Sequence, residues 1–253
     1  MPSSLTRLIE RSAVHADWRQ ILQQALAGLQ PEYLDSLLQD DSWLPGSERL
    51  LAAFRRDLSG LRYLLIGESP YPRRESANGI AFYDAAVTGL WSEQGLSKPV
   101  NRATSLRNLV KTALLAEGLL QQDESGRITQ QAIAALDKNG LIQTLAELFE
   151  NLERAGLLML NATPVLHPGR KPAQEARHWE SFLERLLALI AASVAQPVTL
   201  LLWGRIARLV EKMPASASYD KLVCEHPYNI SFIDNADMRR LFGKLQILQK
   251  QPH

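Results

Sequence analysis

The stretch Leu61-Arg-Tyr-Leu-Leu-Ile-Gly67 decides the fold class, because a short apolar run that ends at a glycine is typical of a buried parallel strand. Three later runs have the same form, namely Leu157–Leu160, Val198–Trp203 and, more weakly, Leu222–Cys224. These four runs predict the strands of one sheet.

Helical spacing of apolar residues fills the intervals between these runs. The expected helices cover Leu106–Gly118, Leu141–Ala155, Trp179–Ala195 and Ile206–Lys212. Residues 4–58 are also helical in pattern, and a Pro45–Gly46 turn is expected to start a helix that contains Leu50 and Phe54. Strands that alternate with helices predict a three-layer α/β/α fold with a central, mostly parallel four-stranded sheet. We expect one domain over residues 1–253, with residues 1–58 as its N-terminal helical part.

Composition narrows the class of protein. Of 253 residues, 46% are hydrophobic and 22% are charged, which is typical of a globular protein with a full core. The single cysteine, Cys224, excludes an internal disulfide and any cysteine-ligated zinc or iron–sulfur cluster. No His/Asp/Glu cluster has metal-ligand spacing, so we expect neither a metal nor a cofactor. With no signal peptide and no apolar run long enough to span a bilayer, we expect a cytoplasmic protein without a membrane segment.

The formal net charge is only +1, so bulk electrostatics give no argument for a nucleic-acid partner. Basic side chains do cluster locally. Taken alone, each cluster is more often solvated surface than a phosphate track. The clusters are Arg73–Arg74; Arg102, Arg107 and Lys111; Arg170–Lys171; and Arg239, Arg240 and Lys244.

Polar residues follow the expected strands at their carboxyl ends, where open α/β sheets bind ligands. Glu68, Ser69 and Tyr71 follow the first strand, Asn161 ends the second, and His226 follows the fourth. Three distant segments are therefore expected to line one cleft.

Seven motifs, in order and covering nearly the whole chain, resemble those of the uracil-DNA glycosylase superfamily, most closely its family 1. They are Gly67-Glu-Ser-Pro-Tyr-Pro72, Ala77-Asn-Gly-Ile-Ala-Phe82, Ser105-Leu-Arg-Asn108, Gly156-Leu-Leu-Met-Leu-Asn161, Trp179-Glu-Ser-Phe182, Leu201-Leu-Trp-Gly204 and His226-Pro-Tyr-Asn-Ile-Ser231. The resemblance implies that the protein flips uracil or a related deaminated base out of DNA and hydrolyses its N-glycosidic bond.

The resemblance implies three base-binding residues. Phe82 would stack on the base, although a core phenylalanine is the simpler interpretation of an Ala-Phe-Tyr run. Asn161 would pair its amide with uracil O4 and N3–H, the opposite of the pattern that cytosine presents, although asparagine after a strand is often a turn or cap residue. Tyr71 would exclude the thymine methyl group, or would be a buried tyrosine with its hydroxyl satisfied.

The same resemblance implies catalytic positions at Glu68, Ser69 and His226. His226 would donate a hydrogen bond to uracil O2, or would be a loop histidine bonded to backbone. Ser69 matches the water-activating aspartate of family 1, but a hydroxyl is neither charged nor basic. Glu68 is therefore the candidate general base, with a bond to backbone or to a nearby arginine such as Arg73 as the alternative.

Three further positions resemble DNA contacts. Ile230 matches a wedge residue that fills the gap left by the flipped base. Ser105 and Ser231 match phosphate contacts, although a serine at a helix start is more often a cap.

The chain also departs from family 1. Pro72 and Gln174 match two histidines of that family. Gly67-Glu-Ser-Pro70 resembles the family 4 motif instead, yet family 4 proteins hold an iron–sulfur cluster through four cysteines, and this chain has one.

Three hypotheses remain at this point. The first is a DNA glycosylase, expected to be a monomer that binds single- or double-stranded DNA. The second is a catalytically weak or inactive module that binds damaged or single-stranded DNA, as Ser69 and Pro72 would favour. The third is a fold relative that uses the cleft for another ligand.

Overall fold

The computed structural model describes residues 4–40, 42–168, 170 and 172–251, and it divides into two compact units. The first unit combines Met1–Ala85 with Gly156–Leu222. The second unit combines Ala86–Ala155 with Val223–His253. Each unit is therefore built from two separate stretches of the chain.

A four-stranded sheet has its strands in the first unit, except that the last two residues of its fourth strand belong to the second, and all four predicted strands are confirmed. The strands are β1 (Tyr63–Gly67), β4 (Leu157–Asn161), β5 (Thr199–Trp203) and β6 (Asp220–Cys224), in the order β4-β1-β5-β6. Strand β1 runs parallel to both β4 and β5, with Tyr63 opposite Leu157 and Thr199. Strands β1, β4 and β5 are buried along nearly their whole length, as continuous apolar runs in a parallel sheet require.

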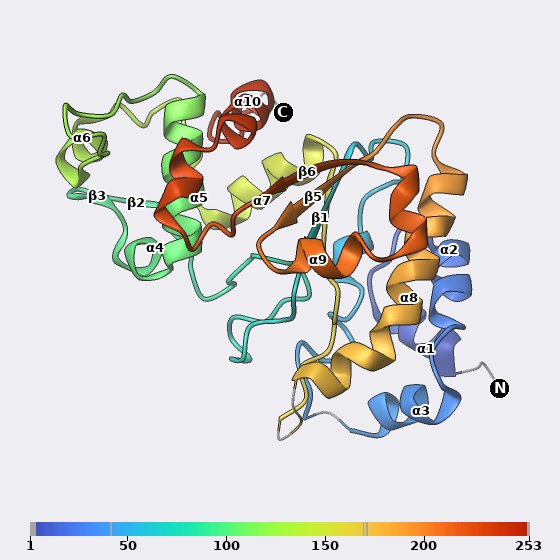
Figure 1. Ribbon diagram of the computed structural model, residues 1–253. Helices are drawn as coiled ribbons and strands as arrows, with labels where there is room; N and C mark the ends of the chain where they lie inside the picture. Colours follow the sequence, from blue (N-terminus) through green and yellow to red (C-terminus); the bar gives the residue numbers. More distant parts are fainter. Residues whose placement is uncertain (1–3, 41, 169, 171, 252–253) are drawn as a thin grey trace. The chain divides into compact units, whose positions relative to one another are not determined.

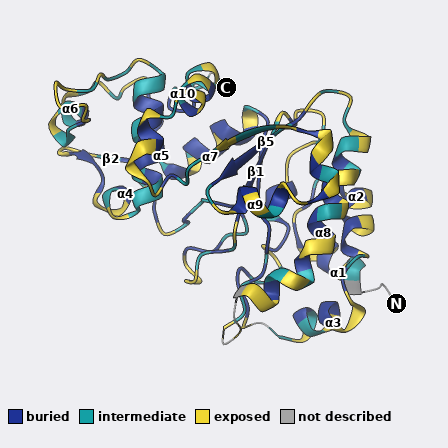
Figure 2. Ribbon diagram, in the orientation of Figure 1, coloured by how far each residue is buried: buried dark blue, intermediate teal, exposed yellow. Residues whose placement is uncertain are grey.

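Helices complete the first unit (Figure 1). They are α1 (Ser4–Arg11), α2 (Ala16–Leu26), α3 (Pro31–Gln39), α8 (Pro172–Ser193) and α9 (Ile206–Val210), with short 3₁₀ segments at Ala52–Phe54 and Pro214–Ser218. Helix α8 packs against α2, and α1 packs against both α2 and α3. Figure 2 shows the buried strands beside helices whose outer faces are exposed. Four fully buried aromatic side chains fill this core, namely Trp18, Trp43, Trp179 and Phe182.

Two sequence predictions in this unit need correction. The helix expected after Pro45–Gly46 is wrong, because only Ala52–Phe54 forms a 3₁₀ turn. Gly46 lies at φ +93°, outside the right-handed helical region. The backbone N–H groups of Arg49, Ala52 and Phe54 then bond to carbonyls three residues back, which is the 3₁₀ pattern. Helix α8 also begins at Pro172, seven residues earlier than the expected start at Trp179.

The second unit is mainly helical. It contains α4 (Lys98–Arg102), α5 (Thr104–Ala116), α6 (Gln130–Ala135), α7 (Leu145–Arg154), a 3₁₀ segment at Ile230–Asp234 and α10 (Ala236–Leu245), together with a hairpin of β2 (Trp91–Ser92) and β3 (Gly95–Leu96). Helices α5 and α7 confirm two sequence predictions, whereas α4, α6, α10 and the hairpin were not predicted. Helix α5 packs against α10 and the 3₁₀ segment at Ile230–Asp234.

Candidate functional site

The carboxyl ends of β1 and β4 bring two of the predicted segments together in the first unit. Gly67 and Asn161, the last residues of these strands, lie opposite each other in the sheet. Beyond them, the N–H of Ala162 donates to the carbonyl of Gly67 (2.8 Å), and the N–H of Thr163 donates to that of Glu68 (3.0 Å). The backbone that carries Glu68 is therefore fixed beside the segment that follows Asn161.

Asn161 has a buried amide with free hydrogen-bonding capacity. Asn161 as a whole is only 5% exposed, and its side chain makes no hydrogen bond to any other described residue. A Cβ on Gly67 would lie 2.8 Å from Asn161 Oδ1 and 2.9 Å from Ala81 Cβ, so only glycine leaves room for this arrangement. An amide at a strand end that bonds to no other described residue is available to a ligand, because open α/β sheets bind ligands beyond the carboxyl ends of their strands. Asn161 caps no helix, so the capping interpretation is wrong.

Phe82 also borders Gly67, and it has an uncommon backbone conformation. Its φ is +65°, which costs a residue other than glycine about 1–3 kcal/mol. The hydroxyl of Tyr71 donates to the Phe82 carbonyl (3.3 Å), and the Phe82 ring packs edge-on against Trp203 at 5.1 Å between centroids. Ring atom Cε2 would be 3.5 Å from a Cβ on Gly67. Phe82 and Asn161 therefore border the same glycine, and the half-buried ring is no ordinary core phenylalanine.

Tyr71 has its hydroxyl engaged, as the simpler sequence interpretation expected. Burial and, to a lesser extent, the charge of Asp84 raise the pKa of this phenol to about 12, against an opposing effect of Arg73. Tyr71 is thus a neutral hydrogen-bond donor that holds the backbone of Phe82.

Glu68 is exposed and forms an ion pair with Arg205 (3.2 Å). An arginine does pair with Glu68, as one alternative interpretation of the sequence expected, but it is not Arg73, which pairs with Asp84 instead (3.2 Å). Arg205 was missed, since it follows β5 at a distance of 137 positions in the chain. Glu68, Ser69 and Arg205 border an open cavity of about 300 Å³. The cavity's other walls are mainly apolar and are formed by Ala162, Thr163, Val165, Leu166, Ala173, Ala176, Ile206 and Leu209.

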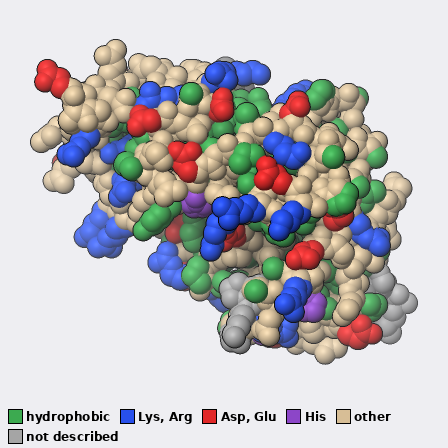
Figure 3. Space-filling model, viewed as in Figure 1, with side chains coloured by type: hydrophobic (Ala, Val, Ile, Leu, Met, Phe, Trp, Pro, Cys, Tyr) green, Lys and Arg blue, Asp and Glu red, His purple; other side chains and the backbone are tan. Residues whose placement is uncertain are grey.

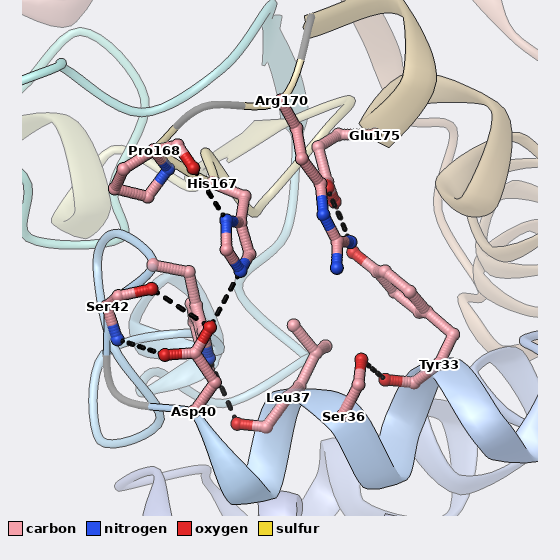
Figure 4. A network of polar contacts seen from close by, with 10 residues as sticks. Tyr33, Ser36, Leu37, Asp40, Ser42, His167, Pro168, Arg170 and Glu175 are labelled. Carbon is pink, nitrogen blue, oxygen red and sulfur yellow. Dashed lines mark hydrogen bonds and ion pairs between the residues drawn. The ribbon is translucent and has the colours of Figure 1, made fainter.

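A polar network anchors the chain that leaves Asn161 (Figure 4). His167 Nε2 lies 2.7 Å from Asp40 Oδ2, and its Nδ1 lies 3.0 Å from the Pro168 carbonyl. Hydrogen bonds from the Ser42 backbone and side chain, and then from His167, hold the pKa of Asp40 below its usual value. No local pattern in the sequence points to His167, because its partner Asp40 lies in a distant segment.

The same network contains a buried carboxylate. Glu175, 1% exposed, accepts a hydrogen bond from the hydroxyl of Tyr33 (2.6 Å) and pairs with Arg170 (3.0 Å). Together with the Asp40–His167 pair, these contacts tie the segment after Asn161 to α3 and the loop that follows it. Gln174 is exposed in α8.

In the second unit, His226 begins a tight, exposed loop, residues 226–231. Its Nδ1 accepts a hydrogen bond from the N–H of Tyr228 (3.1 Å), as the backbone-bonded interpretation expected. A neutral ring must then carry its proton on Nε2, which makes that atom a donor. Tyr228 and Ile230 are 69% and 70% exposed, which is unusual for large apolar side chains.

Ser231 and Ser105, the two predicted phosphate contacts, differ in their surroundings. Ser231 is exposed, and its side chain hydrogen-bonds Glu225. Burial raises the pKa of Glu225, but hydrogen bonds from its own backbone, Ser231 and Asn235 outweigh this effect and lower it. Ser105 lies in the first turn of α5, whose N-cap is Ala103, so the interpretation of Ser105 as a cap is wrong.

The structure thus brings Phe82 and Asn161 together at Gly67 in the first unit, with Tyr71 bonded to the backbone of Phe82. It places His226 with Ile230 and Ser231 in the second unit. The meeting of His226 with Phe82 and Asn161 stays a prediction. In the described ranges, no group of three or more His, Cys, Asp or Glu side chains is arranged to hold a metal ion. No described helix combines the length and the apolar character needed to cross a membrane.

Comparison with known proteins places this geometry in a family. No protein-family model matches the chain. The chain is similar to several uracil-DNA glycosylases. That of Corynebacterium glutamicum is 23% identical to it, over 84% of this chain and 80% of its own length. That of Albidiferax ferrireducens is 24% identical, over 88% of this chain and 82% of its own length. The crystal structure of wild-type UNG from Nitratifractor salsuginis is 40% identical, covers 99% of both chains and has a TM-score of 0.92. The chain belongs to the uracil-DNA glycosylase superfamily.

Membership of this superfamily confirms the resemblance seen in the seven motifs. It also confirms the α/β class with a central, mostly parallel four-stranded sheet and flanking helices. Mimivirus uracil-DNA glycosylase, 16% identical with a TM-score of 0.56 over 90% of this chain, shares the fold alone.

Proposed function

We propose that this superfamily member is a monofunctional DNA glycosylase that excises uracil, or a related deaminated base, from DNA. One observation carries the proposal: the buried, unpaired amide of Asn161 borders the same glycine as the ring of Phe82. Relatives named uracil-DNA glycosylase support the choice of base.

The base is read by hydrogen-bond pattern and by stacking. The amide of Asn161 donates to uracil O4 and accepts from N3–H, whereas cytosine presents the reverse pattern and leaves both groups of Asn161 unpaired. The Phe82 ring stacks on the base and contributes about 1–3 kcal/mol. Tyr71 stands beside Phe82 as a neutral side chain that excludes the thymine methyl group.

Hydrolysis requires that two developing charges be stabilised. As the C1′–N1 bond breaks, its electron pair leaves with uracil, and the sugar becomes cationic. His226 donates its Nε2–H to uracil O2, and the Glu68 carboxylate stabilises the sugar and takes a proton from the water that attacks C1′. Ser69 lacks the basicity for this task, so its hydroxyl serves only to hydrogen-bond the water. The products are free uracil and an abasic site.

The exposed loop 226–231 supplies the DNA contacts. Ile230 fills the space of the flipped base, and Ser231 and Ser105 contact phosphates. The intermixed positive and negative side chains in Figure 3 agree with the net charge of +1, so binding rests on such local contacts rather than on one large basic field.

The direct test uses an end-labelled, single-stranded oligonucleotide with one uracil. We expect alkali-sensitive abasic sites to accumulate with enzyme, and none to form in the matched oligonucleotide with thymine. Tight binding to the uracil strand without strand breakage after alkali would instead identify a binding module. Absence of binding at low salt, where phosphate contacts are strongest, would reject DNA as the partner.

Truncating Ile230 should separate duplex from single-stranded substrate. We expect Ile230→Ala to slow uracil release from duplex DNA about 10-fold, because the wedge offsets part of the unstacking cost of a few kcal/mol. Release from a single strand, which needs little unstacking, should change less than twofold on the same reasoning. Val223→Ala, at another exposed apolar residue of the same unit, is the matched control. Equal loss on both substrates would contradict the wedge role.

We also propose that the chain works as a monomer in the cytoplasm and that residues 1–253 act as one domain. The similarity to Nitratifractor UNG over 99% of both chains supports the last point, because both units fall within one superfamily match.

A further inference from the structure

Helix α5 directs a buried amide at the backbone of loop 226–231. Asn108 is fully buried, and its Nδ2 donates to the carbonyl of Pro227 at 2.8 Å. The carbonyls of Asn229 and Tyr228 lie within 3.3 and 3.5 Å of the same nitrogen. One side chain thus faces three successive carbonyls of the loop.

The Asn229 carbonyl also accepts from the N–H of Phe232 (3.2 Å), whereas no backbone donor bonds to the carbonyls of Pro227 and Tyr228 among the described residues. These two carbonyls therefore depend on the amide of Asn108. The amide supplies two N–H groups, and the N–H of Asn229 closes the turn by bonding to the carbonyl of His226 (2.9 Å). The same turn aims the N–H of Tyr228 at His226 Nδ1. Asn108 is therefore connected to the imidazole through one turn of backbone.

The carbonyl oxygen of the Asn108 side chain, Oδ1, indicates which part of the amide is functional. Its Oδ1 is buried and has no hydrogen-bond partner among the described residues. Leaving a buried acceptor unpaired is unfavourable, and a leucine of similar shape would avoid that cost. The position retains an amide because its N–H groups serve the loop.

The loop is also held at its ends, by contacts of a different kind. Glu225, just before His226, accepts from Asn235 Nδ2 (3.1 Å) and bonds to Ser231. Between these anchors, Tyr228, Asn229 and Ile230 are all exposed. The middle of the loop therefore depends on the donors of Asn108 beneath it.

We propose that Asn108 is a positioning residue for uracil excision: it fixes the backbone of residues 227–229, and thereby the tautomer of His226 and the direction of Ile230. The inference rests on the function proposed above. Asn108 itself is buried and acts through the loop.

The test replaces Asn108 with aspartate, which keeps the shape but removes both N–H donors. We expect kcat on a single-stranded uracil oligonucleotide to fall about 100-fold, the scale of loss that misplaced reacting groups cause. The ¹⁵N signals of the His226 ring should move from one defined neutral tautomer to a mixture. Lowering the pH should partly restore activity relative to wild type, because a protonated aspartate regains one O–H donor. Asn108→Ala, which removes the donors without adding a charge, should show the same loss of kcat without the pH-dependent recovery.

Thr112→Val is the matched control, since Thr112 is equally buried on the same helix and donates mainly to the Asn108 carbonyl of its own helix (2.8 Å). Its kcat should stay within about twofold of wild type at a temperature where all variants are folded, because its hydroxyl does not set the loop carbonyls. A wild-type kcat and an unchanged His226 tautomer in both Asn108 variants would overturn the proposal, as would an equal loss in Thr112→Val. The ring signals need no DNA, so they test the positioning role even if the wild-type protein releases no uracil.

Discussion

Replacement of Asn161 by leucine should abolish uracil release without weakening the fold. Removal of a donor that stabilises developing charge costs about 10²–10³-fold in kcat, and the lost acceptor for N3–H adds to that effect. The amide of Asn161 bonds to no other described residue, so its loss breaks no such contact within the protein. The free energy of unfolding should therefore change by less than about 1 kcal/mol, and the melting temperature by less than about 2–4 °C. Kinetic assays and thermal unfolding of the same preparation measure both effects.

A second asparagine provides the contrast. Asn151 is about as buried as Asn161, but its Nδ2 donates to the carbonyls of Ile247 (2.9 Å) and Gln249 (2.8 Å). Asn151→Leu should therefore lower the melting temperature and leave kcat unchanged wherever the variant is folded. The opposite pattern, in which Asn161→Leu unfolds early but still releases uracil, would remove Asn161 from base recognition.

Replacement of Glu68 by glutamine should be nearly as damaging, through chemistry rather than recognition. A glutamine cannot take a proton from water and carries no charge to stabilise the sugar cation. Loss of a positioned base costs about 10²–10⁴-fold, and we expect this loss in kcat with little change in KM. Single-turnover release of uracil from a single-stranded oligonucleotide measures it directly.

The ion pair with Arg205 requires its own control, because Glu68→Gln also weakens that contact (3.2 Å). Arg205→Ala removes the pair and keeps the carboxylate. Since both side chains are largely exposed, the pair itself contributes little to stability, and kcat of Arg205→Ala should stay within about 10-fold of wild type. Equal kcat values for wild type and Glu68→Gln would remove Glu68 from the mechanism.

The sheet was predictable from the sequence because the apolar composition of its strands indicates buried strands without reference to distant segments. Strands β1, β4 and β5 are apolar runs that end at a glycine or a polar residue, and burial on both faces requires that composition. The short 3₁₀ segment that replaces the helix expected after the Pro45–Gly46 turn was not predictable in the same way. Apolar residues at helical spacing occur there, but a positive φ at Gly46 and bonds three residues apart replaced the expected helix.

The candidate site was predictable where a residue's position along a strand decides its surroundings. Asn161 was found as a strand-end amide, and Phe82 was found through the motif that contains it. Partners that depend on the tertiary fold were missed. Arg205 beside Glu68, Asp40 beside His167 and Asn108 beneath loop 226–231 are separated from their partners by more than a hundred positions. No local pattern reports such pairings, so the sequence offered Arg73 as the partner of Glu68 merely because it is near in the chain.

The order of segments in the sheet has a consequence for synthesis of the protein on the ribosome. The central strand β1 emerges early, but its neighbours β4 and β5 begin only at Leu157 and Thr199. Until then its apolar edges have no partner, and a chain with such long-range pairings closes slowly. A nascent chain that stops before Leu157 already contains Phe82 and Glu68 but has no Asn161 to place beside them. The proposed base-binding site therefore forms late in translation, and unfinished chains are candidates for chaperone binding through their unpaired β1.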